Sequence, residues 1–400
     1  MKKVLFVFLL FCLGILVIYE GFGKKVVNAP DEKDENVTSF FGETKGVFIS
    51  YIDYGVLKGR DETSQKKIID KMIDNSYSYG LNSIILQVRP FSDAIYYSKI
   101  FKPSLTVVNS EDDRLNFDIL SYFIEKAHLK NMKLYAWVNP YRIRNNSNVS
   151  SISDTSVFYS WLDTNDIYVS ENGIYFNPSS KRVLNLIIRG IKEIVSNYDV
   201  DGVLYDDYFY PNKVLDNEDY DKYVEDGGDL SIDEYRVENI NNLILNSYNA
   251  VKDIKKDVLF GISPAGNIEN NLENEYLDVK YLLKNNGYLD FVIPQLYYGF
   301  DNHNKPYIDT VKVWNNLIET TCKLYVGLGI YKSGTEDKYA LSGKDEWIEN
   351  TDIIKKQVVI ARNESNYDGF FVFRYAYLFN DMNNDNLSKE VLNLKTLLNS

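Results

Sequence analysis

Two adjacent aspartates stand out in the sequence because of where they lie. Asp206 and Asp207 close the apolar run of "VDGVLYDDYFYP" (residues 200–211). Like charges repel, and a carboxylate buried without a partner costs free energy. The run predicts a buried strand, so the pair either reaches solvent by accident or performs chemistry at the end of the strand. Carboxyl groups in such a position could act as an acid, a base or a nucleophile.

The elements that must position this pair form a regular series. Short runs rich in β-branched and aromatic residues, typical of parallel strands covered on both faces, recur from Gly46 onward. These runs span residues 46–52, 83–89, 133–139, 201–207, 258–264, 291–297, 324–331 and 369–375. Amphipathic patterns predict helices over 116–131, 181–198, 235–254, 309–321 and about 386–398.

This alternation predicts an α/β fold, a single (β/α)8 TIM barrel over residues 46–400. A doubly wound open sheet is the rival, but it usually has fewer strands and a Gly-rich phosphate turn. No G-x-G-x-x-G follows the first run. In a barrel, catalytic residues lie at the carboxyl ends of the strands and in the loops that follow them.

Polar and aromatic side chains follow the runs at these ends. Taken singly, an arginine here is more often an ion-pair partner, and Asn139-Pro140 alone indicates a turn. When polar residues follow all eight runs, a purely structural role for every one of them is harder to accept. The candidates beside the adjacent aspartates are Asp53, Arg89, Asp93, Asn139, Tyr141, Arg142, Tyr208, Asn267, Gln295, Tyr297 and Arg374.

Carboxylates, amides, arginines and aromatic rings are the groups that glycoside hydrolysis needs, with two carboxyl groups flanking the bond. Neighbours on a strand point to opposite faces, so Asp206 and Asp207 are not that flanking pair by themselves. Which of them faces the barrel axis stays open. The leading candidates for the second carboxylate are Asp93 and Asp53.

The remaining candidates have binding roles in this hypothesis. The tyrosines and Trp137 would form platforms for sugar rings, although Trp137 fits the barrel core equally well. The arginines Arg89, Arg142 and Arg374 would bind acidic groups or orient the aspartates.

Several segments together resemble the glycosyl hydrolase-like family ten. They are "GLNSIILQVRPFSDAIYYSK", "MKLYAWVNPYRI", "VDGVLYDDYFYP", "FGISPAG", "LDFVIPQLYY" and "LYVGLGIYK". The resemblance runs in order over about residues 45–380. It implies an exported bacterial (β/α)8 glycosidase, and for some members an enzyme acting on peptidoglycan glycan strands. The family is expected to vary at Asp93, whereas Asn139, Arg142 and the adjacent aspartates lie in the best-matched motifs.

Two other classes of function fit the same barrel. A catalytically inactive cell-surface sugar-binding protein would have no second carboxylate about 5 to 10 Å from the first. A barrel isomerase or aldolase needs a phosphate site or a Schiff-base lysine, for which Lys332 is the one candidate.

The N-terminus predicts export. Lys2 and Lys3 precede the apolar stretch 4–19, and no clear A-x-A cleavage site follows. We therefore expect residues 1–22 to be an uncleaved signal anchor, with a cleaved signal peptide as the alternative, and residues 23–45 to be a linker. The barrel would then lie on the extracellular face of the cytoplasmic membrane or be secreted to the cell wall.

The composition of the chain limits the classes of ligand that it is expected to bind. The net charge of -13 argues against nucleic-acid binding, leaving a polysaccharide as the expected partner and the N-terminal segment as the expected membrane contact. Two histidines exclude the usual His-rich catalytic zinc centre. Residues 381–390 begin like a calcium loop but have Asn386 at the glycine position. The sequence thus predicts neither a cofactor nor a metal site.

Overall fold

The computed structural model describes residues 42–211, 213, 215–380 and 384–399. The predicted signal segment lies outside the described residues, as do most of the predicted linker and residues 381–383 of the calcium-loop-like stretch. Within the described ranges, no helix combines the length and the apolar character needed to cross a membrane.

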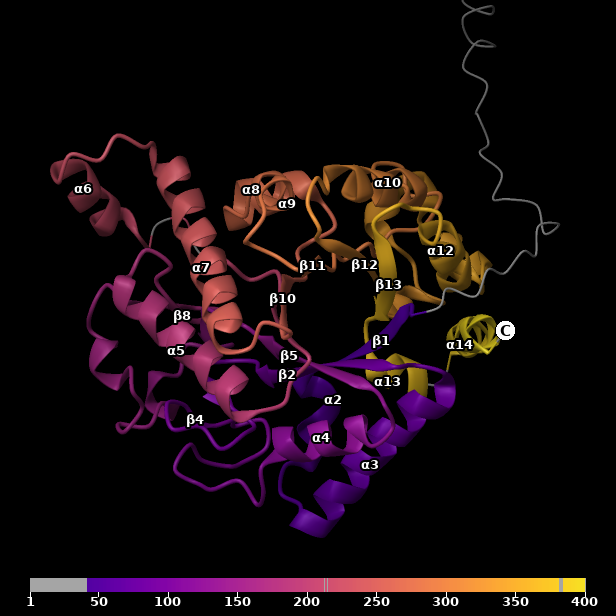
Figure 1. Cartoon of the computed structure of the whole chain (residues 1–400), viewed down its shortest axis with the longest axis horizontal. Helices are drawn as coiled ribbons and strands as arrows, with labels where there is room; N and C mark the ends of the chain where they lie inside the picture. The colour runs from indigo at the N-terminus through magenta and orange to yellow at the C-terminus, as the bar shows by residue number, and fades with distance from the viewer. Residues whose placement is uncertain (1–41, 212, 214, 381–383, 400) are drawn as a thin grey trace, which may run out of the picture. The chain divides into compact units, whose positions relative to one another are not determined.

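The predicted barrel is confirmed, with eight parallel strands that close on themselves inside a ring of helices (Figure 1). The strands are β1 (Thr44–Ile49), β2 (Ser83–Arg89), β5 (Lys133–Val138), β9 (Gly202–Tyr205), β10 (Leu259–Ile262), β11 (Phe291–Val292), β12 (Lys323–Leu328) and β13 (Tyr367–Val372). Each overlaps one predicted run. The order around the barrel follows the order in the chain, and β1 pairs with both β2 and β13.

Some strands end before the predicted run does. The run 46–52 continues past Ile49, but the chain turns after Ser50 into the short helix α2 (Tyr51–Tyr54). Asp53 explains this turn, since its Oδ2 atom accepts hydrogen bonds from the backbone N and the Oγ of Ser50 at 2.8 and 2.7 Å. This local pairing competes with continuation of the strand. Similarly, β13 is followed by the short helix α13 (Tyr375–Phe379).

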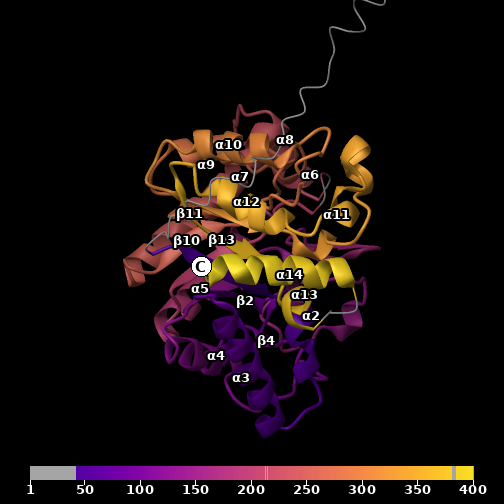
Figure 2. The ribbon, with the colours of Figure 1, turned by 90° about the vertical axis from the view of Figure 1, so that its right-hand side faces the viewer.

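An outer ring of helices covers the barrel, and α14 packs beside α12 (Figure 2). The main ones are α3 (Glu62–Tyr79), α4 (Ile119–His128), α5 (Lys181–Asn197), α7 (Ile232–Ile254), α10 (Tyr307–Leu317), α12 (Ile353–Ala361) and α14 (Asp385–Leu398). The sequence patterns predict all of these except α3 and α12. In α3 the buried Ile69, Met72 and Ile73 lie among many polar residues, which makes its apolar stripe hard to recognise.

Aromatic rings fill the inside of the barrel. The interior cluster consists of Phe48, Ile85, Tyr135, Trp137, Leu204, Phe291, Ile293, Tyr325 and Phe371. Tyr135 meets Phe291 and Phe371 edge to face, at centroid distances of 5.7 and 5.8 Å. Glycine makes room for such rings, because a Cβ on Gly46 would lie 2.1 Å from Phe371 Cδ1. The barrel is therefore a packed core rather than a pore.

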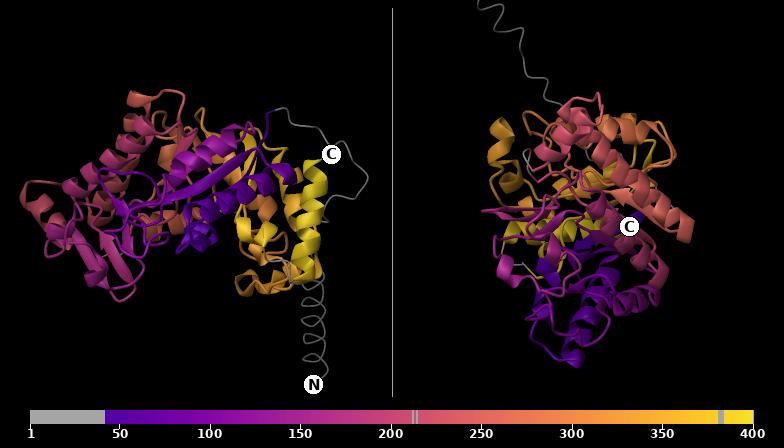
Figure 3. Two further views of the ribbon diagram at one scale, coloured as in Figure 1. Left: turned by 90° about the horizontal axis from the view of Figure 1, so that it is seen from below. Right: turned by 90° about the vertical axis from the view of Figure 1, so that its left-hand side faces the viewer.

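Long connections after β2, β5 and β9 build up the rim at the carboxyl ends of the strands. The first carries the short pair β3 (Asp93–Ala94) and β4 (Lys102–Pro103). The second forms a three-stranded antiparallel sheet of β6 (Arg142–Arg144), β8 (Gly173–Phe176) and β7 (Ile167–Ser170). The third carries α6 (Asn217–Glu225), which lies near this sheet in the view from below (Figure 3), and Asp219 of α6 accepts a hydrogen bond from Asn177, the residue that follows β8.

Buried ion pairs fix these rim connections. Arg144 pairs with Glu111, joining the connections after β2 and β5. Arg236 on α7 pairs with Asp216 at 2.8 Å, and both side chains are almost fully buried. A buried charge that loses its partner is strongly destabilising, so these pairs hold the rim in one arrangement.

The close packing of the barrel interior predicts that alanine substitutions at two glycines differ in their effect on stability. We expect Gly46→Ala to lower the free energy of unfolding by about 1 to 3 kcal/mol, because the added methyl group overlaps the Phe371 ring. Gly55→Ala is the matched control, since a Cβ there meets nothing within 4 Å and its φ is -56°. Thermal unfolding of both variants measures the difference, and equal losses would contradict the packing argument.

Candidate active site

A cavity of about 460 Å³ opens at the carboxyl ends of the barrel strands, and all the strands contribute to it. Its polar and charged lining residues are Ser50, Gln87, Arg142, Asp206, Asp207, Ser263, Gln295 and Arg374. Its apolar and aromatic lining residues are Phe48, Tyr51, Ile52, Trp137, Leu204, Tyr208, Tyr297, Tyr331, Phe373 and Tyr377. We call this cavity the mouth pocket.

Asp206 is the aspartate that faces the barrel axis. Alternate residues of a strand face the same side, so Asp206 faces the same side as Leu204, which belongs to the interior cluster. Val203 and Tyr205 face the other side and pack outward against the helices. The Asp206 residue is only 4% exposed. The question that the sequence leaves open is thus settled by the direction in which β9 faces.

Two neighbours from β5 and its end hold the Asp206 carboxylate. Trp137 Nε1 donates a hydrogen bond to Oδ2 at 2.9 Å. Asn139 Nδ2 lies 3.2 Å from both carboxylate oxygens and donates to them. Asn139 is itself fixed, because its Oδ1 accepts a hydrogen bond from the backbone N of Arg142 at 2.9 Å. Asn139 therefore positions Asp206 and does not line the mouth pocket.

The environment raises the pKa of Asp206 to about 7. Burial is the largest cause, and the nearby charge of Asp207 adds to it. The charge of Arg142 and the hydrogen bonds from Trp137 and Asn139 act in the opposite direction, since they stabilise the ionised form. Asp206 can therefore hold a proton near neutral pH, as a general acid must.

Asp207 also lines the mouth pocket but is partly exposed. Burial raises its pKa, while a hydrogen bond with its own backbone, another from the Gln295 side chain and the charge of Arg142 lower it. Because water reaches Asp207 more easily than Asp206, we expect Asp207 to ionise first. Its charge then helps to keep the proton on Asp206.

Arg142 lies beside the two aspartates and is sandwiched between aromatic rings. Its guanidinium carbon lies 4.7 Å from the centroid of the Tyr208 ring and 5.1 Å from that of Phe91. Its Nε atom is buried and has no hydrogen-bond partner among the described residues. Arg142 thus brings a positive charge to the edge of the pocket.

Aromatic rings form the wall contributed by β11, β12 and β13. Tyr297 lies 5.7 Å from Tyr331 and 5.9 Å from Phe373, and Tyr331 lies 6.1 Å from Tyr377, measured between ring centroids. Arg374 also belongs to this wall. Aromatic rings, several of them with a polar hydroxyl group, are well suited to hold the faces of sugar rings.

Asp53 and Asp93, the predicted partners of the strand-four pair, do not line the mouth pocket. Asp53 is buried and pairs with Arg374, and it also accepts a hydrogen bond from the backbone N of Ala376 at 3.0 Å. Asp93 lies on β3, where it is buried and accepts a hydrogen bond from Phe91 N at 3.3 Å. Burial raises the pKa of Asp93 to about 6. Neither residue therefore presents its carboxylate to the mouth pocket in this structure.

Three other predicted binding residues also lie outside the mouth pocket. Arg89 points outward, with its guanidinium 4.1 Å from the centroid of the Phe101 ring and its Nε unpartnered among the described residues. Tyr141 is buried in the core around the barrel. Asn267 caps the helix α8 (Ile268–Glu275) by accepting a hydrogen bond from Glu269 N at 3.2 Å. The structure does bring Arg142, Tyr208, Gln295, Tyr297 and Arg374 together around the aspartates.

The sequence prediction missed several residues of the pocket, including Ser50 and Phe373. The alternation of inward and outward residues along a strand could have identified them. Ser50 follows the interior residue Phe48 by two positions, and Phe373 follows the interior residue Phe371 in the same way. The sequence alone does not show which alternate set of strand residues faces inward, so these residues could not be distinguished from their neighbours.

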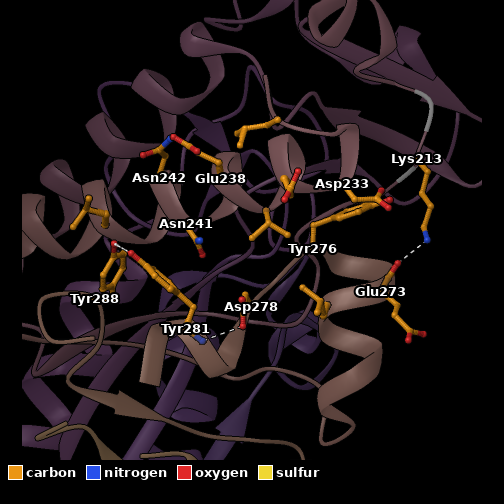
Figure 4. A pocket seen from close by; sticks show the side chains of 15 residues that line it. Lys213, Asp233, Glu238, Asn241, Asn242, Glu273, Tyr276, Asp278, Tyr281 and Tyr288 are labelled. Atoms are coloured by element: carbon orange, nitrogen blue, oxygen red, sulfur yellow. Dashed lines mark hydrogen bonds between the residues drawn. The ribbon is translucent and has the colours of Figure 1, made fainter. Parts of the chain in front are cut away.

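A larger cavity, of about 970 Å³, lies on the outside of the barrel between α7, α8 and α9 (Val279–Lys284) (Figure 4). Its carboxylates include helix caps: Asp278 accepts a hydrogen bond from Tyr281 N at 3.0 Å, and Glu234 accepts two from Ser231. These groups serve local structure. In the described part of the chain, no group of histidine, cysteine or acidic residues is arranged to hold a metal ion.

Known proteins resemble the chain in sequence. Glycosyl hydrolase YngK of Bacillus subtilis (strain 168) is 30% identical over 320 residues, which make up 74% of this chain and 62% of YngK. Glycosyl hydrolase DigH of Escherichia coli (strain K12) is 29% identical over 360 residues, which make up 82% of this chain and 80% of DigH. The chain thus spans less than two thirds of the length of YngK.

Solved structures resemble it in fold. The glycoside hydrolase domain of PgaB (BpsB) from Bordetella bronchiseptica superposes with a TM-score of 0.56 at 11% identity, covering 89% of this chain and 99% of that domain. The endo-1,4-beta-mannanase from Rhizomucor miehei gives 0.53 at 11% identity, covering 89% and 95%. The family model described as Glycosyl hydrolase-like 10 matches residues 43–342, which contain seven of the barrel strands, β1 to β12. The chain therefore belongs to the Glycosyl hydrolase-like 10 family.

Proposed function

We propose that this chain is an exported glycoside hydrolase that cleaves a glycosidic bond in a polysaccharide, with peptidoglycan glycan strands as the substrate. One observation carries the proposal. Asp206 lies at the barrel axis with a pKa of about 7, beside a second carboxyl group and facing a wall of aromatic rings. This arrangement supplies a proton donor and a binding surface for sugars at one place.

In this mechanism Asp206 is the general acid. It protonates the oxygen of the leaving sugar while the bond to C1 breaks and positive charge develops on the ring. The ionised Asp207 stabilises that charge. The mouth pocket excludes part of the solvent, which strengthens both interactions.

Arg142 supports an acidic sugar as the substrate, because its partly exposed side chain lines the mouth pocket. Its guanidinium lies over the Tyr208 ring and beside the two aspartates, whereas Arg374 in the same pocket is already paired with Asp53. Guanidinium groups bind carboxylates through paired hydrogen bonds. The lactyl carboxylate of a muramic sugar carries such a group, which favours peptidoglycan over neutral glycans.

The predicted N-terminal segment would hold the barrel outside the cytoplasmic membrane, or be removed during secretion. Both outcomes place the barrel near the cell wall. A catalytically inactive sugar-binding protein is the alternative, because the acidic residues among the described lining residues of the mouth pocket, Asp206 and Asp207, both come from the end of β9.

The first test is hydrolysis of purified peptidoglycan, with and without its stem peptides. We expect release of soluble glycan fragments, and a loss of kcat/KM of about 100-fold or more in Asp206→Asn, because proton donation contributes about that much. Asp233→Asn, in the outer cavity, is the matched control and should keep full activity. Full activity of Asp206→Asn would contradict the catalytic role, and glycan binding without hydrolysis would favour the sugar-binding alternative.

The second test is the pH profile. Since the acid must carry its proton, kcat/KM should fall as the pH rises above about 7. Trp137→Phe removes a hydrogen bond that stabilises the ionised form of Asp206, so its pKa rises and the descending limb moves to higher pH. Trp314→Phe is the matched control, because its lost hydrogen bond to Gly266 O lies outside the mouth pocket. A limb that stays in place in Trp137→Phe would argue against Asp206 as the titrating acid.

A further inference from the structure

The mouth pocket has its carboxyl groups on one wall. Among the lining residues that the structure describes, Asp206 and Asp207 are the acidic ones, and both come from the end of β9. Their hydrogen-bond partners differ: Asp206 accepts a hydrogen bond from Trp137 on β5, and Asp207 accepts one from the Gln295 side chain, which follows β11. Hydrolysis by two protein carboxylates requires the groups to face each other across the sugar ring, roughly 5 to 10 Å apart.

Nearby carboxylates outside the pocket already have partners. Asp53 is neutralised by Arg374. Glu275 accepts hydrogen bonds from the backbone N atoms of Phe209 and Tyr210 at 2.8 and 2.9 Å. Neither lines the pocket, so neither can reach the face of the sugar that lies away from β9.

Tyrosine is the other protein nucleophile that glycosidases use. Tyr331 lies on the far wall, but burial raises its pKa to about 12. Burial also raises the pKa of Tyr297 well above its usual value. Neither phenol ionises near neutral pH, and the far wall has no carboxylate among its described lining residues to act as a base for them.

The substrate itself can supply the missing group. In a β-linked 2-acetamido sugar, the acetamido oxygen reaches C1 from the face opposite to the leaving oxygen. We propose that the mouth pocket takes β-linked 2-acetamido sugars, and that the acetamido oxygen attacks C1 in place of a second protein carboxylate. This inference rests on the proposed function and specifies its substrate class and its nucleophile.

The atoms balance without any further reactant except water. Asp206 gives its proton to the glycosidic oxygen, the C1–O bond breaks, and the acetamido oxygen bonds to C1 to form a bicyclic oxazolinium ion. Asp207 accepts the hydrogen bond of the amide N–H and stabilises the positive charge. Asp206 then takes a proton from water, whose oxygen attacks C1. The oxazolinium ring opens, the acetamide is restored, and the product keeps the β configuration.

The pocket has features that suit this group. Phe48, Leu204, Trp137 and Phe373 give it an apolar floor, next to the carboxylates, on which the acetamido methyl group can lie. Gln295 restrains Asp207 through a side-chain hydrogen bond, and its own Nε2 lies 3.2 Å from Ser263 O. A restrained carboxylate costs less entropy to align with the amide N–H.

The test uses the full-length chain and peptidoglycan glycan strands without stem peptides. Proton NMR should show the β anomer as the first product. A thiazoline analogue of the bicyclic intermediate should inhibit competitively. Strands that have been chemically N-deacetylated should lose at least 100-fold in kcat, and N-acetylation of the same strands should restore it.

Other outcomes separate the two proposals. Formation of the α anomer first, or equal hydrolysis of deacetylated strands, would overturn this inference and leave the proposed hydrolase intact. A glycosyl ester on Asp207, trapped with a 2-deoxy-2-fluoro glycosyl fluoride and found by mass spectrometry, would overturn it in the same way. If the chain hydrolyses no glycan at all, the proposed function itself fails.

Discussion

The hydrogen bonds from Trp137 and Asn139 to the Asp206 carboxylate are the interaction on which the rest of the site depends. They require β5 to lie directly beside β9, with Trp137 opposite Leu204 in the register. A slip by one residue would turn Asp206 toward the helices and bring Asp207 to the axis. Below the carboxylate, the packed rings of the interior exclude water, and this burial is the main reason why Asp206 can hold a proton near neutral pH.

Much of the fold could be predicted from the sequence, because each barrel strand is a continuous apolar run and most helices have a clear amphipathic pattern. The position of Asp206 and Asp207 at the end of the fourth strand was also predictable. Which of them faces inward was not, since parity becomes meaningful only when the barrel closes. The positions of Asp53 and Asp93 could not be predicted for a different reason: the chain turns into α2 directly after β1 and into β3 soon after β2, and neither side chain lines the mouth pocket.

Charged residues at the rim divide into two kinds. Arg144, Glu111, Arg236 and Asp216 are buried in pairs and hold the long connections in place. Arg142 instead stacks between two rings, and both Arg142 and Asp207 stay partly exposed. In the first kind, the burial of two charges costs desolvation free energy, but the resulting ion pair fixes the rim in one arrangement. The second kind leaves its charge available to a ligand, as a binding site requires.

The Asp53–Arg374 pair lies where the first and last strands of the barrel meet, since β1 pairs with β13 along this seam. The family match ends at residue 342, whereas β13, Phe373 and Arg374 lie beyond it. A fragment cut at that boundary would keep Asp206 and Asp207 but would expose the unpaired edges of β1 and β12. Exposed, apolar strand edges invite pairing between molecules, so such a fragment would be expected to aggregate before it could bind a glycan.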